Sequence, residues 1–460
     1  MFESIHDFMY WLGGGATLYL IPFLIAIGVL VFVHEWGHFI VARLCGVRVE
    51  TFSIGFGKKL WTRKDKQGTE WQVALIPLGG YVKMFGDTDP ASSKFSESVE
   101  EEGQLRAMTA EEKAVSFYGK PVWQRAAIVF AGPAINFIFA ILVLACMYTT
   151  VGRPVTPPLA GAVIVGGAAY EGGFQPDDRV LTIDGEKIYR FADIQRAVAI
   201  SLDKPLVFEV EREGKVVTLN NVKPRLDTVT DRFGFSHSRG LMGIIGPGLG
   251  LDVESIQAVD GQTGDITGLL KARMGQVVRL SMKAIGDFPA QDITVRLHAD
   301  TNEGFIKGEG DLAKTIQIAM HDEPEVLKFA PLEAVSESIS ETWFVSVGTL
   351  QTLGQMVIGT RSAQELGGII RIGAVTGDAA QQGFFAFLTL CALLSINLGL
   401  INLLPIPMLD GGHLTFYAIE AIKGKPVSEK VQDMALRFGF VLLIALMVFA
   451  NLNDLIQLSK

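Results

Sequence analysis

The stretch LYLIPFLIAIGVLVFVHEWGHFIVA, residues 18–42, decides the fold class of this chain. It is long enough to cross a bilayer, because a hydrocarbon core of about 30 Å needs roughly 20 apolar residues of helix. Its second half nevertheless carries three ionisable side chains, those of His34, Glu35 and His38. A charged side chain at the centre of a spanning helix costs about 2.5 kcal/mol or more, and the default inference for such residues is function. The stretch therefore predicts a membrane span that contains a functional site.

Three further apolar runs extend this prediction to four transmembrane helices. They cover residues 126–149, 384–404 and 438–452. The whole chain is 49% hydrophobic and only 19% charged, which is unusual for a soluble protein. A formal net charge of -9 argues against nucleic acid as a partner. The long apolar runs make the lipid bilayer the expected surroundings. We expect an α-helical polytopic membrane protein.

Lysine and arginine residues near the span ends predict the orientation of these helices. One group follows the first span within residues 43–66, and another lies between the third and fourth spans within residues 423–437. Both loops are therefore expected to face the cytoplasm. Residues 152–381 and both termini are then expected on the other side of the membrane.

His34-Glu35-Trp36-Gly37-His38 has the pattern H-E-x-x-H. On a helix, positions i and i+4 share a face, so both imidazoles can reach one metal ion. Zinc suits them because it accepts nitrogen ligands, and a catalytic zinc site keeps one position open for water. Iron or cobalt would also accept nitrogen and carboxylate ligands. Glu35 is the expected general base, since it can take a proton from that water.

A catalytic zinc site usually has three protein ligands, so a third ligand is expected elsewhere in the chain. The candidate is Asp410 in NLLPIPMLDGGH, residues 402–413, which follows the third span at its cytoplasmic end. Pro405 and Pro407 prevent a regular helix there and leave backbone groups that need protein or a wet cavity around them. His413 is a rival ligand, and spacing alone favours Asp410 without excluding the histidine.

These two motifs together resemble the signature of the site-2 proteases, in particular the bacterial regulator of sigma-E protease group. Three other stretches also match that family: GPAIN at residues 132–136, GGYV at residues 79–82 and SINLG at residues 395–399. One departure is Gly367-Gly368-Ile369, where the family often has Gly-Gly-Pro. It lies away from the candidate metal ligands, so it concerns local loop geometry rather than catalysis.

The resemblance implies an intramembrane zinc endopeptidase of the bacterial inner membrane, with one zinc ion per chain and the region between the membrane halves outside the cytoplasm. Its ligands would be His34, His38 and Asp410, and Glu35 would be the catalytic acid and base. The substrate-binding residues implied by the family are Asn402, Pro405, Pro407, Gly79 and Gly80. Expected substrates are single-span membrane proteins already trimmed by another protease, such as anti-sigma factors or remnant signal peptides. Residues 50–85 correspond to a membrane-associated β element whose edge could pair with an unwound substrate strand.

The region between the two membrane halves is expected to be β-rich. Residues 172–180 and Ile183-Asp184-Gly185 resemble a PDZ domain of the protease-associated type, which binds extended peptides by strand addition. Residues 254–261 repeat part of this pattern and predict a divergent second PDZ-like unit, with an irregular insertion as the alternative. Residues 332–358 are apolar at helical spacings but interrupted by glutamates, which favours an amphipathic helix on the membrane surface over a fifth span.

The expected organisation has five parts. They are a first membrane half at residues 1–150, PDZ-like units at 155–226 and 240–322, the surface helix at 327–360 and a second membrane half at 361–460. The PDZ-like units would control which substrates reach the site. A non-catalytic scaffold would lack part of the motif, whereas His34, Glu35, His38 and Asp410 are all present. A metal or ion transporter would need polar groups through the whole depth of the bilayer, whereas the four motif residues are expected at a single depth.

Overall fold

The computed structural model describes residues 16–89, 92–95, 98–101, 104–201, 204–230, 236–284, 290–308, 310–318 and 325–458. In these ranges, four helices are long and apolar enough to cross a membrane. They are α2 (Ala16–Leu44), α4 (Val122–Thr150), α11 (Phe384–Asn402) and α13 (Glu429–Leu458). The four spans expected from the sequence are therefore confirmed as helices of spanning length. The two chain ends, residues 1–15 and 459–460, lie outside the described ranges.

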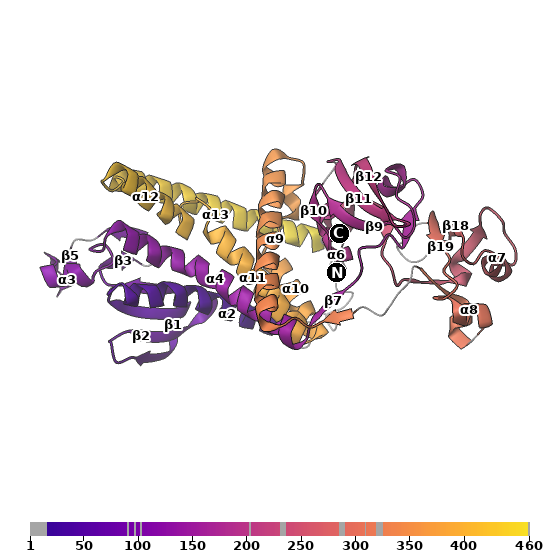
Figure 1. Ribbon diagram of the computed structural model, residues 1–460. Helices are drawn as coiled ribbons and strands as arrows, with labels where there is room; N and C mark the ends of the chain where they lie inside the picture. Colours follow the sequence, from indigo (N-terminus) through magenta and orange to yellow (C-terminus); the bar gives the residue numbers. More distant parts are fainter. Residues whose placement is uncertain are drawn as a thin grey trace.

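Helix α4 lies at the centre of the membrane bundle and packs against α2 and α11 (Figure 1). Small residues allow this close approach, as is usual between helices in a bilayer. A Cβ atom added to Gly37 of α2 would lie 2.4 Å from the carbonyl oxygen of Ala131 in α4. One added to Gly399 of α11 would lie 2.9 Å from the carbonyl oxygen of Pro133. The two helices that flank α4 therefore meet its backbone almost directly.

The fourth helix extends well beyond the apolar run at residues 438–452. Its C-terminal end carries buried polar residues, among them Asp454, which is fully enclosed. The Asp454 carboxylate accepts hydrogen bonds from the backbone nitrogens of Gly368 (2.9 Å) and Arg371 (3.0 Å). These contacts cap the first turn of α10 (Ile369–Gln382), which packs against α2 and α11. Helix α13 can therefore extend through this polar segment, because the polar side chains have hydrogen-bond partners at the start of α10.

Residues that follow α2 form the β element expected from the sequence. Strands β1 (Val49–Lys64) and β2 (Glu70–Met84) pair antiparallel with several register shifts. Phe52 is fully buried, stacks on Trp71 and meets Phe39 of α2 edge to face. The base of the hairpin is therefore fixed against the helix that carries the H-E-x-x-H motif. The short elements before α4 are β3 (Asp87–Asp89), β4 (Ser92–Phe95), β5 (Ser98–Glu101), β6 (Gln104–Ala107) and α3 (Ala110–Val115).

A β-rich region lies at the opposite end of the bundle from the β1–β2 hairpin (Figure 1). Its first part contains β7 (Arg153–Val155), β8 (Ala162–Ile164), α5 (Ala168–Glu171), β9 (Arg179–Ile183), β10 (Glu186–Lys187), α6 (Phe191–Ile200), β11 (Leu206–Arg212), β12 (Lys215–Val222), β13 (Arg225–Thr230), β14 (Ser236–Leu241) and β15 (Ile244–Ile245). Its second part contains β16 (Gly250–Asp252), β17 (Ile256–Val259), α7 (Ile266–Ala272), β18 (Val277–Met282), β19 (Gln291–Arg296), α8 (Glu303–Lys307), β20 (Thr315–Gln317) and β21 (Glu325–Leu327). Short 3₁₀ turns lie at Val253–Ser255, Gly310–Lys314 and Ala363–Glu365.

Strand β8 joins the two parts of this region. One sheet has the order β10-β9-β11-β12, and a five-stranded sheet has the order β15-β8-β19-β18-β17. In the second sheet, β8 pairs with β15 on one side and with β19 on the other. The two parts are therefore connected by backbone hydrogen bonds as well as by the chain.

Helix α9 (Pro331–Ile358) crosses the bundle at a steep angle, between the spanning helices and the β-rich region (Figure 1). It packs against α4 and α11, and Ala334, Ser338 and Thr342 are buried on that side. Trp343 and Val357 remain exposed. Helix α9 is not among the helices of spanning character in the ranges given above.

Candidate metal centre

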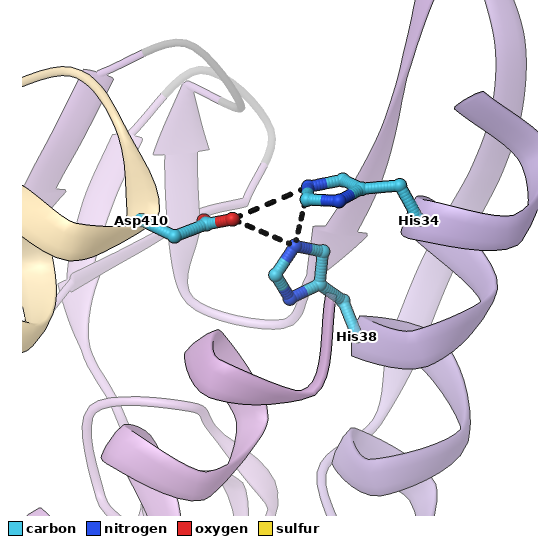
Figure 2. A group of neighbouring side chains, drawn as sticks. All are labelled: His34, His38 and Asp410. Carbon is cyan, nitrogen blue, oxygen red and sulfur yellow. Dashed lines mark hydrogen bonds and ion pairs between the residues drawn. The ribbon is translucent and has the colours of Figure 1, made fainter. Parts of the chain in front are cut away.

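The structure brings together the three side chains singled out from two distant motifs (Figure 2). His34 and His38 lie one turn apart on α2, and Asp410 is the first residue of α12 (Asp410–Lys423). Asp410 Oδ2 lies 3.2 Å from Nε2 of His34 and 3.6 Å from Nε2 of His38. The two Nε2 atoms are themselves 3.2 Å apart.

These separations fit a single zinc ion. With zinc–ligand distances of about 2.0–2.2 Å, two ligands of a tetrahedral site lie roughly 3.3–3.5 Å apart. Asp410 Oδ2 is buried and makes no hydrogen bond with any described residue, which is costly for a carboxylate oxygen. A cation between the three atoms would satisfy it. The donor set of two imidazole nitrogens and one carboxylate also leaves the fourth position of the ion open for water.

Helix α4 determines how the His38 ring is oriented. Nδ1 of His38 lies 2.9 Å from the main-chain oxygen of Ile128. Because a carbonyl oxygen can only accept, Nδ1 is the donor, and in the neutral ring that binds a metal the Nε2 lone pair then faces Asp410. Gly132 lies against the same ring, and a Cβ atom there would be 2.2 Å from Nε2. Gly132 belongs to the GPAIN stretch that matches the family, so the sequence already pointed to it. The Ile128 contact could not be found from the sequence, because it uses a backbone oxygen.

His34 has a partner on the same helix. The amide of Asn136 lies 3.0 Å from Nδ1 of His34, and Asn136 is completely buried. Both candidate histidines therefore use Nδ1 for a contact with α4 and Nε2 for the shared position. Such outer contacts fix the orientation of metal-binding histidines. Asn136 entered the sequence analysis only as part of a matching motif and without a role.

Asp410 is held at the start of α12 by a tightly folded loop. Met408 has a left-handed φ of 81°, a conformation that non-glycine residues adopt rarely. A Cβ atom on Gly411 would lie 2.2 Å from the oxygen of Leu404, and one on Gly412 would lie 2.4 Å from the oxygen of Ile406. The loop can therefore fold back on the first turn of α12 only where those positions are glycine.

A buried ion pair anchors α12 to α4. Arg125 of α4 and Glu420 of α12 are 2.6 Å apart, with side chains only 7% and 13% exposed. Arg125 also lies over the ring of Tyr417. The helix that carries Asp410 is thus fixed to the helix that orients both histidines. His413, the rival ligand, lies on α12 but is not in the group of ligand atoms that the described residues bring together.

Of the two predicted substrate-binding glycines, Gly80 lies beside Glu35. A Cβ atom on Gly80 would be 3.1 Å from Cγ of Glu35 and 2.6 Å from the oxygen of Ser53. Gly79 has a φ of 139° and lies against the ring of Phe56. Strand β2 therefore passes close to the expected catalytic carboxylate. Asn402 ends α11, and Pro405 and Pro407 lie in the loop between it and Asp410.

Three side chains that could hold a metal ion, two of them on a helix of spanning length and with the Glu35 carboxylate beside them, are the arrangement expected of a membrane-embedded metallopeptidase. The sequence pattern of peptidase family M50 matches residues 22–446. The chain therefore belongs to that family, the site-2 proteases, whose members are zinc metalloproteases. The family and the zinc requirement expected from the sequence are both confirmed.

Similar proteins cover almost the full length of this chain. A protein of Agrobacterium fabrum named "Putative zinc metalloprotease" is 37% identical over 445 residues, which is 97% of each chain. The "Regulator of sigma E protease" of Haemophilus influenzae is 34% identical over 95% of this chain and 98% of its own. The "Regulator of sigma-E protease RseP" of Salmonella typhimurium shows the same identity and the same coverage.

Proposed function

We propose that this chain is an intramembrane zinc endopeptidase that cuts single-span membrane proteins in or near their transmembrane segments. The observation that carries the proposal is the His34–His38–Asp410 group, whose ligand atoms lie 3.2–3.6 Å apart. Two of the three residues lie on α2, a helix of spanning character, and the third begins α12. Its biological setting would be regulated intramembrane proteolysis, as the printed names of the sigma-E protease relatives suggest.

In the proposed mechanism, His34, His38 and Asp410 hold one zinc ion per chain. Bound zinc would polarise the scissile carbonyl and make a water molecule more acidic. A carboxylate oxygen of Glu35 takes a proton from the attacking water and delivers it to the departing amine.

The substrate is proposed to bind as an extended strand. A peptide bond inside a helix is sterically closed to attack, so the segment must first unwind. Gly80 lets strand β2 lie directly against Glu35, and Gly79 lets it lie against the ring of Phe56. The substrate strand is proposed to pair with the edge of β2 at these positions. Asn402, Pro405 and Pro407, in the segment that leads to Asp410, are proposed to hold that strand on its other side.

The β-rich region is proposed to lie outside the cytoplasm and to select substrates through two PDZ-like units, at residues 155–226 and 240–322. Asp184 and Asp260 support the internal repeat. Both have φ of 50° and are followed by a glycine of positive φ. The side chain of Asp184 accepts from the nitrogen of Val207 (2.9 Å), and that of Asp260 accepts from Arg279 (2.8 Å).

The proposed orientation follows from the basic residues at 43–66 and 423–437. It places the β1–β2 hairpin on the cytoplasmic side of a bacterial inner membrane and the chain ends on the other side. The surface helix at 327–360 would lie at the outer face. Substrates already trimmed by another protease would then pass the PDZ-like units and reach the metal.

Zinc content tests the ligand assignment directly. Asp410→Ala and His413→Ala are made in the full chain and purified in detergent, and bound zinc is measured by elemental analysis. We expect Asp410→Ala to lose zinc, because two histidines alone hold it poorly, and His413→Ala to keep about one zinc per chain. If His413→Ala loses zinc while Asp410→Ala retains it, the third ligand is the histidine and the assignment is wrong.

A further inference from the structure

Asn136 has a hydrogen-bonding arrangement that the proposed function does not use. It lies on α4 with no exposed surface, and its Nδ2 lies 3.0 Å from Nδ1 of His34. Its Oδ1 is buried and has no hydrogen-bond partner among the described residues. The hydroxyl of Ser395 on α11 donates to the main-chain oxygen of Asn136 at 2.9 Å. The residue is therefore held from two sides, yet one amide atom is unsatisfied.

The chemistry of His34 limits how this amide can be turned. A neutral imidazole donates through one nitrogen and accepts through the other. Nε2 of His34 points at Asp410 and His38, so a metal at that position needs the Nε2 lone pair. The ring proton then lies on Nδ1, and Nδ1 needs an acceptor. An amide NH₂ group cannot accept a hydrogen bond, whereas an amide oxygen can.

A half-turn of the Asn136 amide exchanges its nitrogen and oxygen and leaves every other atom in place. Either orientation leaves one amide atom without a described partner, so the number of hydrogen bonds does not decide between them. Metal binding distinguishes the two orientations. Only when the amide oxygen of Asn136 faces Nδ1–H of His34 is the Nε2 lone pair of His34 free to bind the metal.

We infer that Asn136 is a positioning residue that presents its amide oxygen to Nδ1–H of His34 and holds that ring for zinc binding. This inference rests on the proposed role of His34 as a ligand. The contact parallels the one between Ile128 and His38, so α4 supplies the acceptor for both histidines. Loss of an outer contact of this kind typically weakens metal affinity by about 10–100-fold.

The test compares zinc affinities of the purified full chain by competition with a chelator of known affinity. Asn136→Leu keeps a similar volume but has no acceptor, so we expect zinc binding about 10–100-fold weaker. Asn136→Asp can only accept, and its charge faces a dication, so we expect affinity equal to or above that of the unsubstituted chain. Asn136→Ala is a second truncation, with the same expectation as leucine, should the leucine variant fail to fold.

Asn397 on α11 provides the matched control. Its oxygen accepts from Thr349 at 2.9 Å and it makes no described contact with the metal group. Asn397→Asp and Asn397→Leu are expected to leave zinc affinity unchanged. The inference is overturned if Asn136→Asp loses as much affinity as Asn136→Leu, since the amide NH₂ or packing would then matter. It is also overturned if both truncations bind zinc normally. A separate His34→Ala variant that kept full zinc affinity would instead contradict the proposed function.

Discussion

At the scale of single residues, glycines decide how closely neighbouring elements approach the candidate ligands. Gly132 of α4 lies against the ring of His38, and Gly80 of β2 lies against Glu35. Neither glycine has a side chain, so neither can supply a side-chain ligand or general base. Their effect is to let a helix and a strand pack directly on the site, which closes it from two sides.

Gly132→Ala is predicted to disturb the metal centre. The added Cβ atom would lie 2.2 Å from Nε2 of His38, so the ring or α4 must move. We expect zinc affinity to fall by an order of magnitude or more, as it does when the outer contacts of a metal-binding histidine are lost. Gly28→Ala on α2 is the control, since nothing lies within 4 Å of its added Cβ atom. Equal zinc affinity in the two variants would contradict this view of Gly132.

At the scale of elements, α4 organises the site although it supplies no candidate ligand. It contacts Nδ1 of each histidine, packs on α2 and α11, and holds α12 through Arg125 and Glu420. The H-E-x-x-H helix and the Asp410 helix are therefore positioned through a common neighbour. Movement of α4 would disturb both ligand sets together.

Some features of these elements could be predicted from the sequence and others could not. Hydropathy predicts the spans, because a bilayer selects length and polarity, and the pairing of His34 with Asp410 follows from the two motifs. The Ile128 contact was not predictable, because a backbone oxygen has no side-chain signature. The sharing of β8 between two sheets was missed because pairing between distant strands leaves no local pattern. The long fourth helix was underestimated because residues such as Asp454 look like loop residues until their partners on α10 are known.

At the scale of the whole molecule, one buried ionic network connects the membrane bundle with the β-rich region. Glu341 of α9 accepts from Arg153 of β7 (2.5 Å) and pairs with Arg196 of α6 (2.5 Å). The side chains of Glu341 and Arg153 are only 6% and 9% exposed. A cavity of about 560 Å³ lies beside this network, between the β-rich region and α9. The network therefore fixes how the proposed substrate-selecting region lies on the bundle.

Glu341→Gln is predicted to loosen this contact. Removing one partner of a buried ion pair costs roughly 3–5 kcal/mol, because the remaining charge is left uncompensated. We expect faster amide hydrogen exchange in α6 and β7 and a lower melting temperature. Glu337→Gln is the control, since Glu337 is 43% exposed and lies 3.4 Å from Arg153. Similar changes in both variants would show that the network does not depend on Glu341.

The pH dependence of the same contact follows from the pKa of Glu341. Burial raises this pKa, but the contacts with Arg196 and Arg153 outweigh burial and hold it below its ordinary value of 4.5. Stability from the ion pair is therefore complete above about pH 4.5 and is lost as the pH falls through the lower folded-state value. Acid should speed hydrogen exchange in α6 of the unsubstituted chain, and this part of the acid response should be absent from Glu341→Gln.

The proposed protease activity is tested most directly by cleavage of a tagged single-span substrate by the purified unsubstituted chain and by Glu35→Gln, with zinc measured in both. Glu35 is not a proposed ligand, so both proteins should hold about one zinc per chain, and only the unsubstituted chain should cut. Equal cleavage by the two proteins, or an absence of both cleavage and bound zinc, would contradict the proposal of an intramembrane protease centred on this site.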